Sequence, residues 1–174
     1  MLRSFGADIQ HGHVVRDIKA AMRFWAETME VGPFVYRPEV VLREAVFRER
    51  PTVIRLAVGL AFRGETMIEL LQPLDDAPSP FTEFLAAGRE GLQHFGFWPD
   101  DLDGAAAQCR ERGLVLDYQV QATGTQPTLF FRDPGGIGAM IELIEGGAGK
   151  RASYEPIRTL ARGWRPGDPA WHEA

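Results

Sequence analysis

Two identical tetrapeptides each place an acidic residue inside an apolar segment. The sequence Met-Ile-Glu-Leu occurs at residues 67–70 and again at residues 140–143, and both copies lie in runs typical of β-strands. We therefore expect Glu69 and Glu142 among side chains that cannot solvate a carboxylate. A carboxylate in such surroundings normally becomes neutral, pairs with a cation or binds a metal ion. The repetition predicts a duplicated fold in which the two acids share one cavity.

The segments upstream of the two copies also match each other. One constant shift along the sequence takes Gly12 to Gly96 and Asp17 to Asp101. Each of these aspartates precedes apolar residues at helical spacing, which is the pattern of an amphipathic helix with an N-terminal cap. Strand-like segments lie before and after each predicted helix. Each half of the chain is thus expected to run β-α-β-β-β.

The predicted fold class is α+β, with two tandem βαβββ modules that form an open, half-barrel cavity. We expect residues 1–174 to form a single domain, with a first module at 9–72, a linker with a short helix at 73–90, a second module at 91–145 and a C-terminal extension at 146–174. The first module is the longer one, and we expect its additional residues between positions 37 and 50.

The same shift identifies two further candidates for a site. It relates Gln10 to His94, each on the strand that precedes a predicted helix. A pseudo-twofold axis between the modules would bring these two residues together with Glu69 and Glu142. One nitrogen and three oxygen donors suit a divalent ion, for which Zn, Ni, Co, Mn and Mg are all chemically admissible. The alternatives are that the two carboxylates line a metal-free cavity, that the histidine is an ordinary core residue and that the glutamine is a hydrogen-bonding residue of the cavity.

A neighbouring histidine offers another ligand. Strand alternation puts Gln10 on one face of its strand and His11 and His13 on the other. A one-residue bulge would reverse this arrangement and supply His11 in place of Gln10.

The repeat resembles the vicinal oxygen chelate superfamily, which includes glyoxalase I, methylmalonyl-CoA epimerase, extradiol dioxygenases and bleomycin-resistance proteins. The resemblance rests on residues 14–18, 91–95 and 131–136 together with both tetrapeptides. It implies that each module forms half of an open barrel with a metal ion inside. It also implies that the metal ligands are Gln10, Glu69, His94 and Glu142, and that the chain forms a homodimer.

The resemblance includes departures from the known enzymes. The epimerases have His at the position of Gln10 and Gln at the position of Glu69, and their additional acidic base would fall in residues 53–62, which contain no Asp or Glu. Glutathione-type glyoxalase I has Arg at the position of Val14. Extradiol dioxygenases bind iron through two histidines and one glutamate, whereas the four candidate residues of this chain include a single histidine, His94.

Composition excludes several other classes of protein. The chain has 174 residues, a net charge of −5 and a single cysteine, Cys109. It therefore offers no electrostatic basis for nucleic-acid binding, no intramolecular disulfide and no zinc site built from cysteines. No apolar run reaches membrane-spanning length, and residues 1–6 lack the apolar core of a signal peptide. We expect a cytoplasmic protein with a small-molecule substrate.

The predicted function is that of a metal-dependent isomerase, epimerase or lyase. Its substrate would be a small carbonyl or acyl-thioester compound that reacts through a metal-stabilised enolate. Glu142 is the predicted base, as the resemblance to glyoxalase I implies. The alternatives are a non-catalytic binding protein of the resistance type and a ring-cleaving dioxygenase. The arginine- and tryptophan-containing tail from residue 150 onward is expected to pack as an extension, or to cover the cavity and bind an anionic group.

Overall fold

The computed structural model describes residues 5–121, 126–146 and 148–174. Residues 1–4 of the opening segment, which bear on the expected absence of a signal peptide, lie outside this part. The first half contains β1 (Ala7–Val14), α1 (Ile18–Glu27), β2 (Phe34–Phe47), β3 (Arg50–Arg63) and β4 (Thr66–Pro73). After α2 (Pro80–Ala86), the second half contains β5 (Gly91–Trp98), α3 (Leu102–Glu111), β6 (Val115–Val120), β7 (Thr128–Arg132) and β8 (Met140–Leu143). The tail forms α4 (Ala148–Ser153), α5 (Glu155–Gly163) and β9 (Trp171–Glu173).

The two longest predicted helices begin where their capping residues stand. The Asp17 carboxylate accepts a hydrogen bond from the Ala20 backbone N–H at 2.9 Å, and Asp101 does the same for Gly104 at 2.9 Å. These bonds satisfy backbone donors that the first turn of a helix leaves without partners. Each helix then buries one apolar face, which includes Met22 in α1 and Cys109 in α3.

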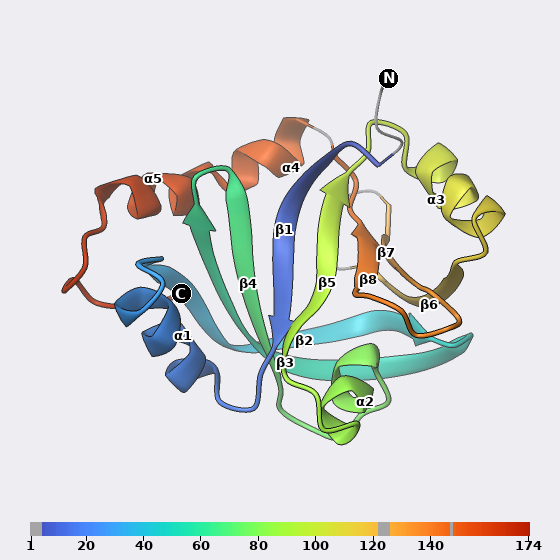
Figure 1. Cartoon of the computed structure of the whole chain (residues 1–174), viewed down its shortest axis with the longest axis horizontal. Helices are drawn as coiled ribbons and strands as arrows, with labels where there is room; N and C mark the ends of the chain where they lie inside the picture. Colours follow the sequence, from blue (N-terminus) through green and yellow to red (C-terminus); the bar gives the residue numbers. More distant parts are fainter. Residues whose placement is uncertain (1–4, 122–125, 147) are drawn as a thin grey trace.

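The strands form one curved mixed sheet with helices around it (Figure 1). Their order is β3-β4-β1-β5-β8-β7-β6-β2-β9, and β2 also pairs with β3. In the middle of this order, β1 and β5 run antiparallel to each other, whereas β1 pairs with β4 and β5 pairs with β8 in parallel. The fold is therefore mixed α+β with a barrel-like sheet.

The long hairpin of β2 and β3 joins the two ends of this sheet. The strands β2 and β3 are each 14 residues long. The additional residues expected between 37 and 50 continue these strands, so that Ala45 pairs with Val120 and Phe47 with Tyr118 on β6. The opening expected in a half-barrel is thus bridged by β2 on this side. In Figure 1 the hairpin crosses behind the strands β1, β4 and β5.

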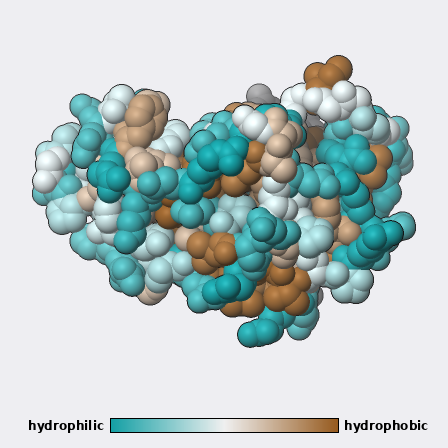
Figure 2. Space-filling view, turned by 90° about the horizontal axis from the view of Figure 1, so that it is seen from below, coloured by the Kyte–Doolittle hydropathy of each residue, from teal (hydrophilic) through white to brown (hydrophobic). Residues whose placement is uncertain are grey.

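Buried apolar side chains line the inside of the curved sheet. One cluster includes Leu56 and Leu60 of β3, Tyr118 of β6 and Phe130 of β7, and Phe81 of α2 joins it from one end. A second cluster lies between α1 and the outer face of β3 and β4, and a third lies beneath α3. Apolar residues also form patches near the middle of the lower face, where hydrophilic residues surround them (Figure 2). Within the described part of the chain, no helix has the length and apolar character needed to cross a bilayer.

A buried acid fixes the far end of the β2–β3 hairpin. Asp117 of β6 is 3% exposed and accepts hydrogen bonds from Arg48 at 3.1 Å and from Arg132 at 2.7 Å. The Arg48 backbone N–H also donates to the Asp117 carbonyl at 2.9 Å. Arg48 and Glu49 form the hairpin turn with positive φ angles of 47° and 65°. Because neither residue is glycine, contacts to β6 have to stabilise this turn.

Replacing this acid should loosen the hairpin. We expect Asp117→Ala to lower the free energy of unfolding by about 1–3 kcal/mol, because two guanidinium groups lose a charged hydrogen-bond acceptor. Chemical denaturation at neutral pH measures the difference. The control Glu39→Ala removes an exposed ion pair with Arg55 and should change stability by about 0.5 kcal/mol or less. Equal effects of the two substitutions would show that Asp117 does not anchor the hairpin.

Candidate functional site

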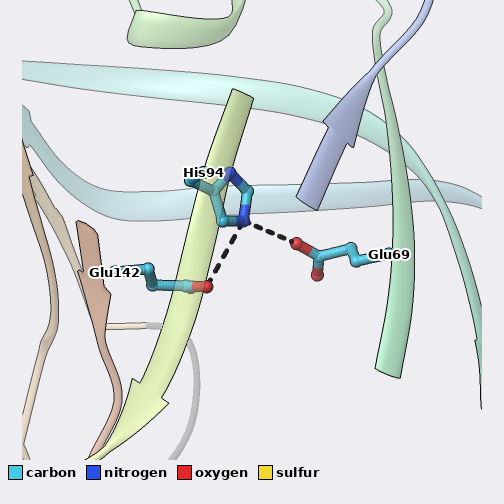
Figure 3. A group of neighbouring side chains, drawn as sticks. All are labelled: Glu69, His94 and Glu142. Atoms are coloured by element: carbon cyan, nitrogen blue, oxygen red, sulfur yellow. Dashed lines mark ion pairs between the residues drawn. The ribbon is translucent and has the colours of Figure 1, made fainter. Parts of the chain in front are cut away.

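The four residues predicted for the site lie together inside the sheet. Gln10 comes from β1, Glu69 from β4, His94 from β5 and Glu142 from β8. The His94 Nε2 atom lies 3.3 Å from a carboxylate oxygen of Glu69 and 3.3 Å from one of Glu142. Figure 3 shows the three side chains pointing toward one another. The ligand atoms of these three residues all lie within 4.8 Å of one another.

The strand register explains why these residues meet. Along one row of paired positions, Glu69 lies beside Gly12, Gly12 beside His94, and His94 beside Met140. Along the second row, Glu142 lies beside Gly96, Gly96 beside Gln10, and Gln10 beside Met67. Across the strands, both rows therefore have the same order of residues: Glu, Gly, a polar side chain and Met. The polar side chain is His94 in the first row and Gln10 in the second. Antiparallel pairing of β1 with β5 places the two rows next to each other.

Two glycines create the space in which the polar side chains meet. A Cβ atom on Gly12 would lie 1.9 Å from the His94 Nε2 atom, and one on Gly96 would lie 2.7 Å from the Gln10 Cβ atom and 3.0 Å from Glu142. Any side chain at either position would therefore overlap the site. The absence of Cβ atoms lets the imidazole and the amide lie over the backbone of the neighbouring strand.

Gln93 is a residue of the site that sequence reasoning missed. Its Oε1 atom lies 2.7 Å from His94 Nδ1, and its amide nitrogen lies 3.0 Å from the Met140 sulfur. Neighbouring residues of a regular strand face opposite sides, but the β1–β5 register shifts between Gly12 and His13, and both Gln93 and His94 are buried. When His94 Nδ1 donates to Gln93, the imidazole is oriented with Nε2 toward the carboxylates. The sequence did contain a signal for Gln93, because Gln93 and His94 are two adjacent polar residues in an otherwise apolar strand.

The structure places Gln10, rather than His11, against the carboxylates. Gln10 is 1% exposed, and its amide nitrogen donates to Glu69 at 2.9 Å and to Glu142 at 2.7 Å. The register is regular from Gln10 to Gly12, so the bulge that would bring His11 inward is absent there. His11 instead contacts Phe95 edge-on, with the ring centroids 5.2 Å apart.

The acids determine the charge of the imidazole. Burial alone would lower the pKa of His94, but the carboxylates of Glu142 and Glu69 raise this pKa to about 9. Without a metal ion, His94 therefore carries a proton at neutral pH and forms ion pairs with both acids. A metal ion bound to Nε2 would replace this proton.

A cavity of about 790 Å³ opens beside the cluster. Gln10, Glu69 and Glu142 line it, together with residues of the hairpin and of the tail. Gly149, Ser153, Tyr154 and Ile157 of the tail form part of its wall, so the extension both packs on the sheet and covers part of the cavity. Behind this wall, Trp98 of β5 is stacked on Tyr154 with ring centroids 5.7 Å apart.

Two tyrosines of the cavity keep their protons at neutral pH. Burial raises the pKa of Tyr118 above its ordinary value, and the charge of Glu142 raises it further. Burial likewise raises the pKa of Tyr154, with Glu69 and Glu142 adding to the effect. Both phenols are therefore neutral and keep a proton that they can donate in a hydrogen bond.

The donor set fits a divalent metal ion. Two carboxylates and one imidazole, converging from three strands, are ligands that Zn²⁺, Mn²⁺, Ni²⁺ and Co²⁺ accept. Gln10 directs its amide nitrogen, which is not a metal ligand, at the carboxylates. Rotation of this amide by half a turn would direct its oxygen there instead.

Filling the space above β1 should disrupt the cluster. We expect Gly12→Ala to displace the His94 ring, to lower the free energy of unfolding by about 1–3 kcal/mol, and to weaken divalent-ion binding by about tenfold or more. Denaturation and calorimetric titration with Zn²⁺ measure the two effects. The control Gly163→Ala adds a Cβ where no atom lies within 4 Å. It should lower neither the free energy of unfolding nor the affinity for Zn²⁺. Unaltered Zn²⁺ affinity in Gly12→Ala would contradict a binding role for His94.

Comparison with known proteins identifies structures that share the fold. No curated protein matches the sequence significantly. Among solved structures, methylmalonyl-CoA epimerase from Mycobacterium tuberculosis has a TM-score of 0.58 and 23% identity, covering 87% of this chain and 96% of the epimerase. The Streptomyces coelicolor epimerase in complex with 2-nitronate-propionyl-CoA has a TM-score of 0.58 and 23% identity over 83% of this chain and 99% of the epimerase. A hypothetical protein from Bacillus halodurans has a TM-score of 0.59 and 18% identity over 80% and 93% of the two chains.

These structures are similar to the chain in fold. The sequence itself matches a family model over residues 9–130, a range that begins within β1, ends within β7 and includes three of the four clustered residues. The chain belongs to the Glyoxalase/Bleomycin resistance protein/Dioxygenase superfamily.

Proposed function

We propose that the protein is a metal-dependent isomerase, epimerase or lyase that acts on a carbonyl compound or an acyl thioester. The observation that carries the proposal is the convergence of Glu69, His94 and Glu142 beside a cavity large enough for a small-molecule substrate. The matching rows of the two halves support an origin from two tandem βαβββ modules at 9–72 and 91–145.

The proposed ligands of the metal ion are Glu69, His94, Glu142 and, after rotation of its amide, Gln10. A divalent ion held there supplies Lewis-acid polarisation of a carbonyl oxygen and a fixed orientation for the substrate. Gln93 Oε1 lies 2.7 Å from His94 Nδ1, so an Nδ1–H donated to Gln93 would leave Nε2 for the metal ion. Glu69 is the more accessible acid, with a side chain 17% exposed against 8% for Glu142, and we assign it a binding role only.

Glu142 is the proposed base. Its carboxylate faces the cavity, and Phe130 lies directly across the strand pair from it, so that water has little access to one side of the acid. A carboxylate in these surroundings can take a proton from the carbon next to a carbonyl group and return it to the same or a neighbouring carbon. Tyr154 lines the same cavity and remains protonated, so it can stabilise negative charge that develops on the substrate oxygen.

The similar epimerases support an acyl thioester as the substrate. One of them contains 2-nitronate-propionyl-CoA, and this chain offers Arg37 and Arg43 on the β2 side of the cavity for an anionic group. The sequence identity between this chain and the epimerases is low, and the epimerases have other residues at the positions of Gln10 and Glu69. These differences favour an acyl or carbonyl group other than that of the epimerase substrate. The homodimer and the cytoplasmic location expected from the sequence remain parts of the proposal.

A second candidate is a metal-free binding protein for a drug or metabolite. It is favoured by the hydrogen bonds that the Gln10 amide donates to both acids and by the raised pKa of His94, because together they satisfy the cluster without an ion. It predicts that the purified protein contains no stoichiometric metal and that a chelator leaves ligand binding unchanged. Tightly bound iron with oxygen-dependent turnover would instead indicate a dioxygenase.

Removing the charge of the proposed base provides a direct test. We expect Glu142→Gln to fold normally and to lower proton exchange at the substrate carbon by about 10²-fold or more. Exchange is followed by NMR in D₂O with Zn²⁺-, Ni²⁺-, Co²⁺- and Mn²⁺-loaded protein and a panel of acyl-CoA thioesters and 2-oxoaldehyde hemithioacetals. The control Glu39→Gln alters an exposed acid and should retain the wild-type rate. Full turnover by Glu142→Gln would refute its assignment as the base.

A further inference from the structure

The walls next to the acid cluster are apolar on both sides. Leu60 of β3 lies directly across the strand pair from Glu69, and Phe130 of β7 lies across from Glu142. Two pairs further along, Val58 lies opposite Leu71. All four apolar residues line the cavity and are at least nine-tenths buried. A ligand that reaches the acids must therefore lie against hydrocarbon on either side of its reacting group.

The buried part of this lining offers no cation to a charged ligand. Among the described lining residues the cationic side chains are Arg37 and Arg43, and both are exposed on β2. An anionic group deep in the cavity would lose its hydration and gain no partner from the protein beyond the cluster itself. The energetic cost of such burial disfavours a second charged group on the inner part of the ligand.

One polar atom in the apolar wall lacks a partner. The Tyr118 hydroxyl is buried and has no hydrogen-bond partner in the described structure, although its ring packs against Phe81 and Phe130. Tyr118 is paired with Phe130 in the strand register, which places it two strands away from Glu142. A buried hydroxyl without a partner is unfavourable, so a neutral acceptor on the ligand would be stabilised there.

We infer that the ligand of this cavity has two neighbouring oxygens at one end and an uncharged, mainly apolar body of about four or more carbon atoms beyond them, since cavities of this size hold groups larger than a three-carbon unit. The inference rests on the proposed function, because the paired oxygens are those that the metal site would bind. It excludes short polar oxoaldehyde adducts and dicarboxylates as the preferred substrates.

A series of alkyl hydroxamates tests the inference, because each carries the same two neighbouring oxygens. Acetohydroxamate, butanohydroxamate and hexanohydroxamate are titrated calorimetrically into Zn²⁺-loaded protein. Each buried methylene group should tighten binding by up to about fourfold, so we expect hexanohydroxamate to bind at least about thirtyfold more tightly than acetohydroxamate. Affinities within about threefold of each other would overturn the inference.

A pair of matched variants distinguishes the cavity wall from other apolar surfaces. Val58→Thr is nearly isosteric and places a hydroxyl in the wall, whereas Val53→Thr makes the same change at a position that is 49% exposed. The chain-length preference should fall about threefold or more in the first variant and persist in the second. A preference unaffected by Val58→Thr would overturn the proposed location. Tyr118→Phe, which removes only the hydroxyl, should retain the preference, and its loss there would contradict an apolar wall.

Chelation separates this inference from the proposed function. Dissociation of every hydroxamate on treatment with EDTA, with a steep chain-length dependence beforehand, supports both. A steep dependence that survives EDTA would support the apolar ligand class and refute the metal-dependent function. Metal-dependent binding without any chain-length dependence would support the function and overturn the ligand class.

Discussion

The site depends on the close approach of side chains over two glycines. Because Gly12 and Gly96 lack Cβ atoms, the imidazole of His94 and the amide of Gln10 can each lie over the adjacent strand. Antiparallel pairing of β1 and β5 turns these two local features into one cluster. Regular strands with side chains at both positions would hold the acids and the histidine apart, and each buried carboxylate would then lack a partner.

The remainder of the sheet protects this cluster from water. The β2–β3 hairpin extends to β6 and bridges the ends of the curved sheet, and Asp117 holds its turn through Arg48. The tail covers another part of the cavity through Tyr154 and Ile157. These additions enclose the cavity with apolar walls. Ion pairs and hydrogen bonds are stronger in such surroundings than in water, which makes the satisfaction of each buried polar group more important.

The sequence predicted which residues meet in the cluster better than it predicted the hairpin and the tail that surround the cavity. Identical tetrapeptides, capping aspartates and glycines at one constant shift were sufficient to bring Gln10, His94, Glu69 and Glu142 to one place, because strand periodicity and pseudo-symmetry determine which side chains share a face. Gln93 was missed because a register shift breaks that periodicity. The extended hairpin was missed because its turn, Arg48-Glu49, contains none of the residues that usually adopt positive φ. The position of the tail depends on contacts between residues distant in sequence, which local patterns do not encode.

The balance of charge gives a physical reason for a metal ion in this site. Two carboxylates and a protonated His94 would together carry one formal negative charge in surroundings that solvate it poorly. When a divalent ion replaces the proton on His94, the formal charge of the three residues and the ion is zero. Exchange of the proton for the ion therefore relieves the remaining cost of burying the acids. The Gln10 amide, which donates to both acids when no ion is present, can rotate to offer its oxygen after the exchange. The same four side chains thus satisfy one another in the metal-free state and still provide ligands to a divalent ion.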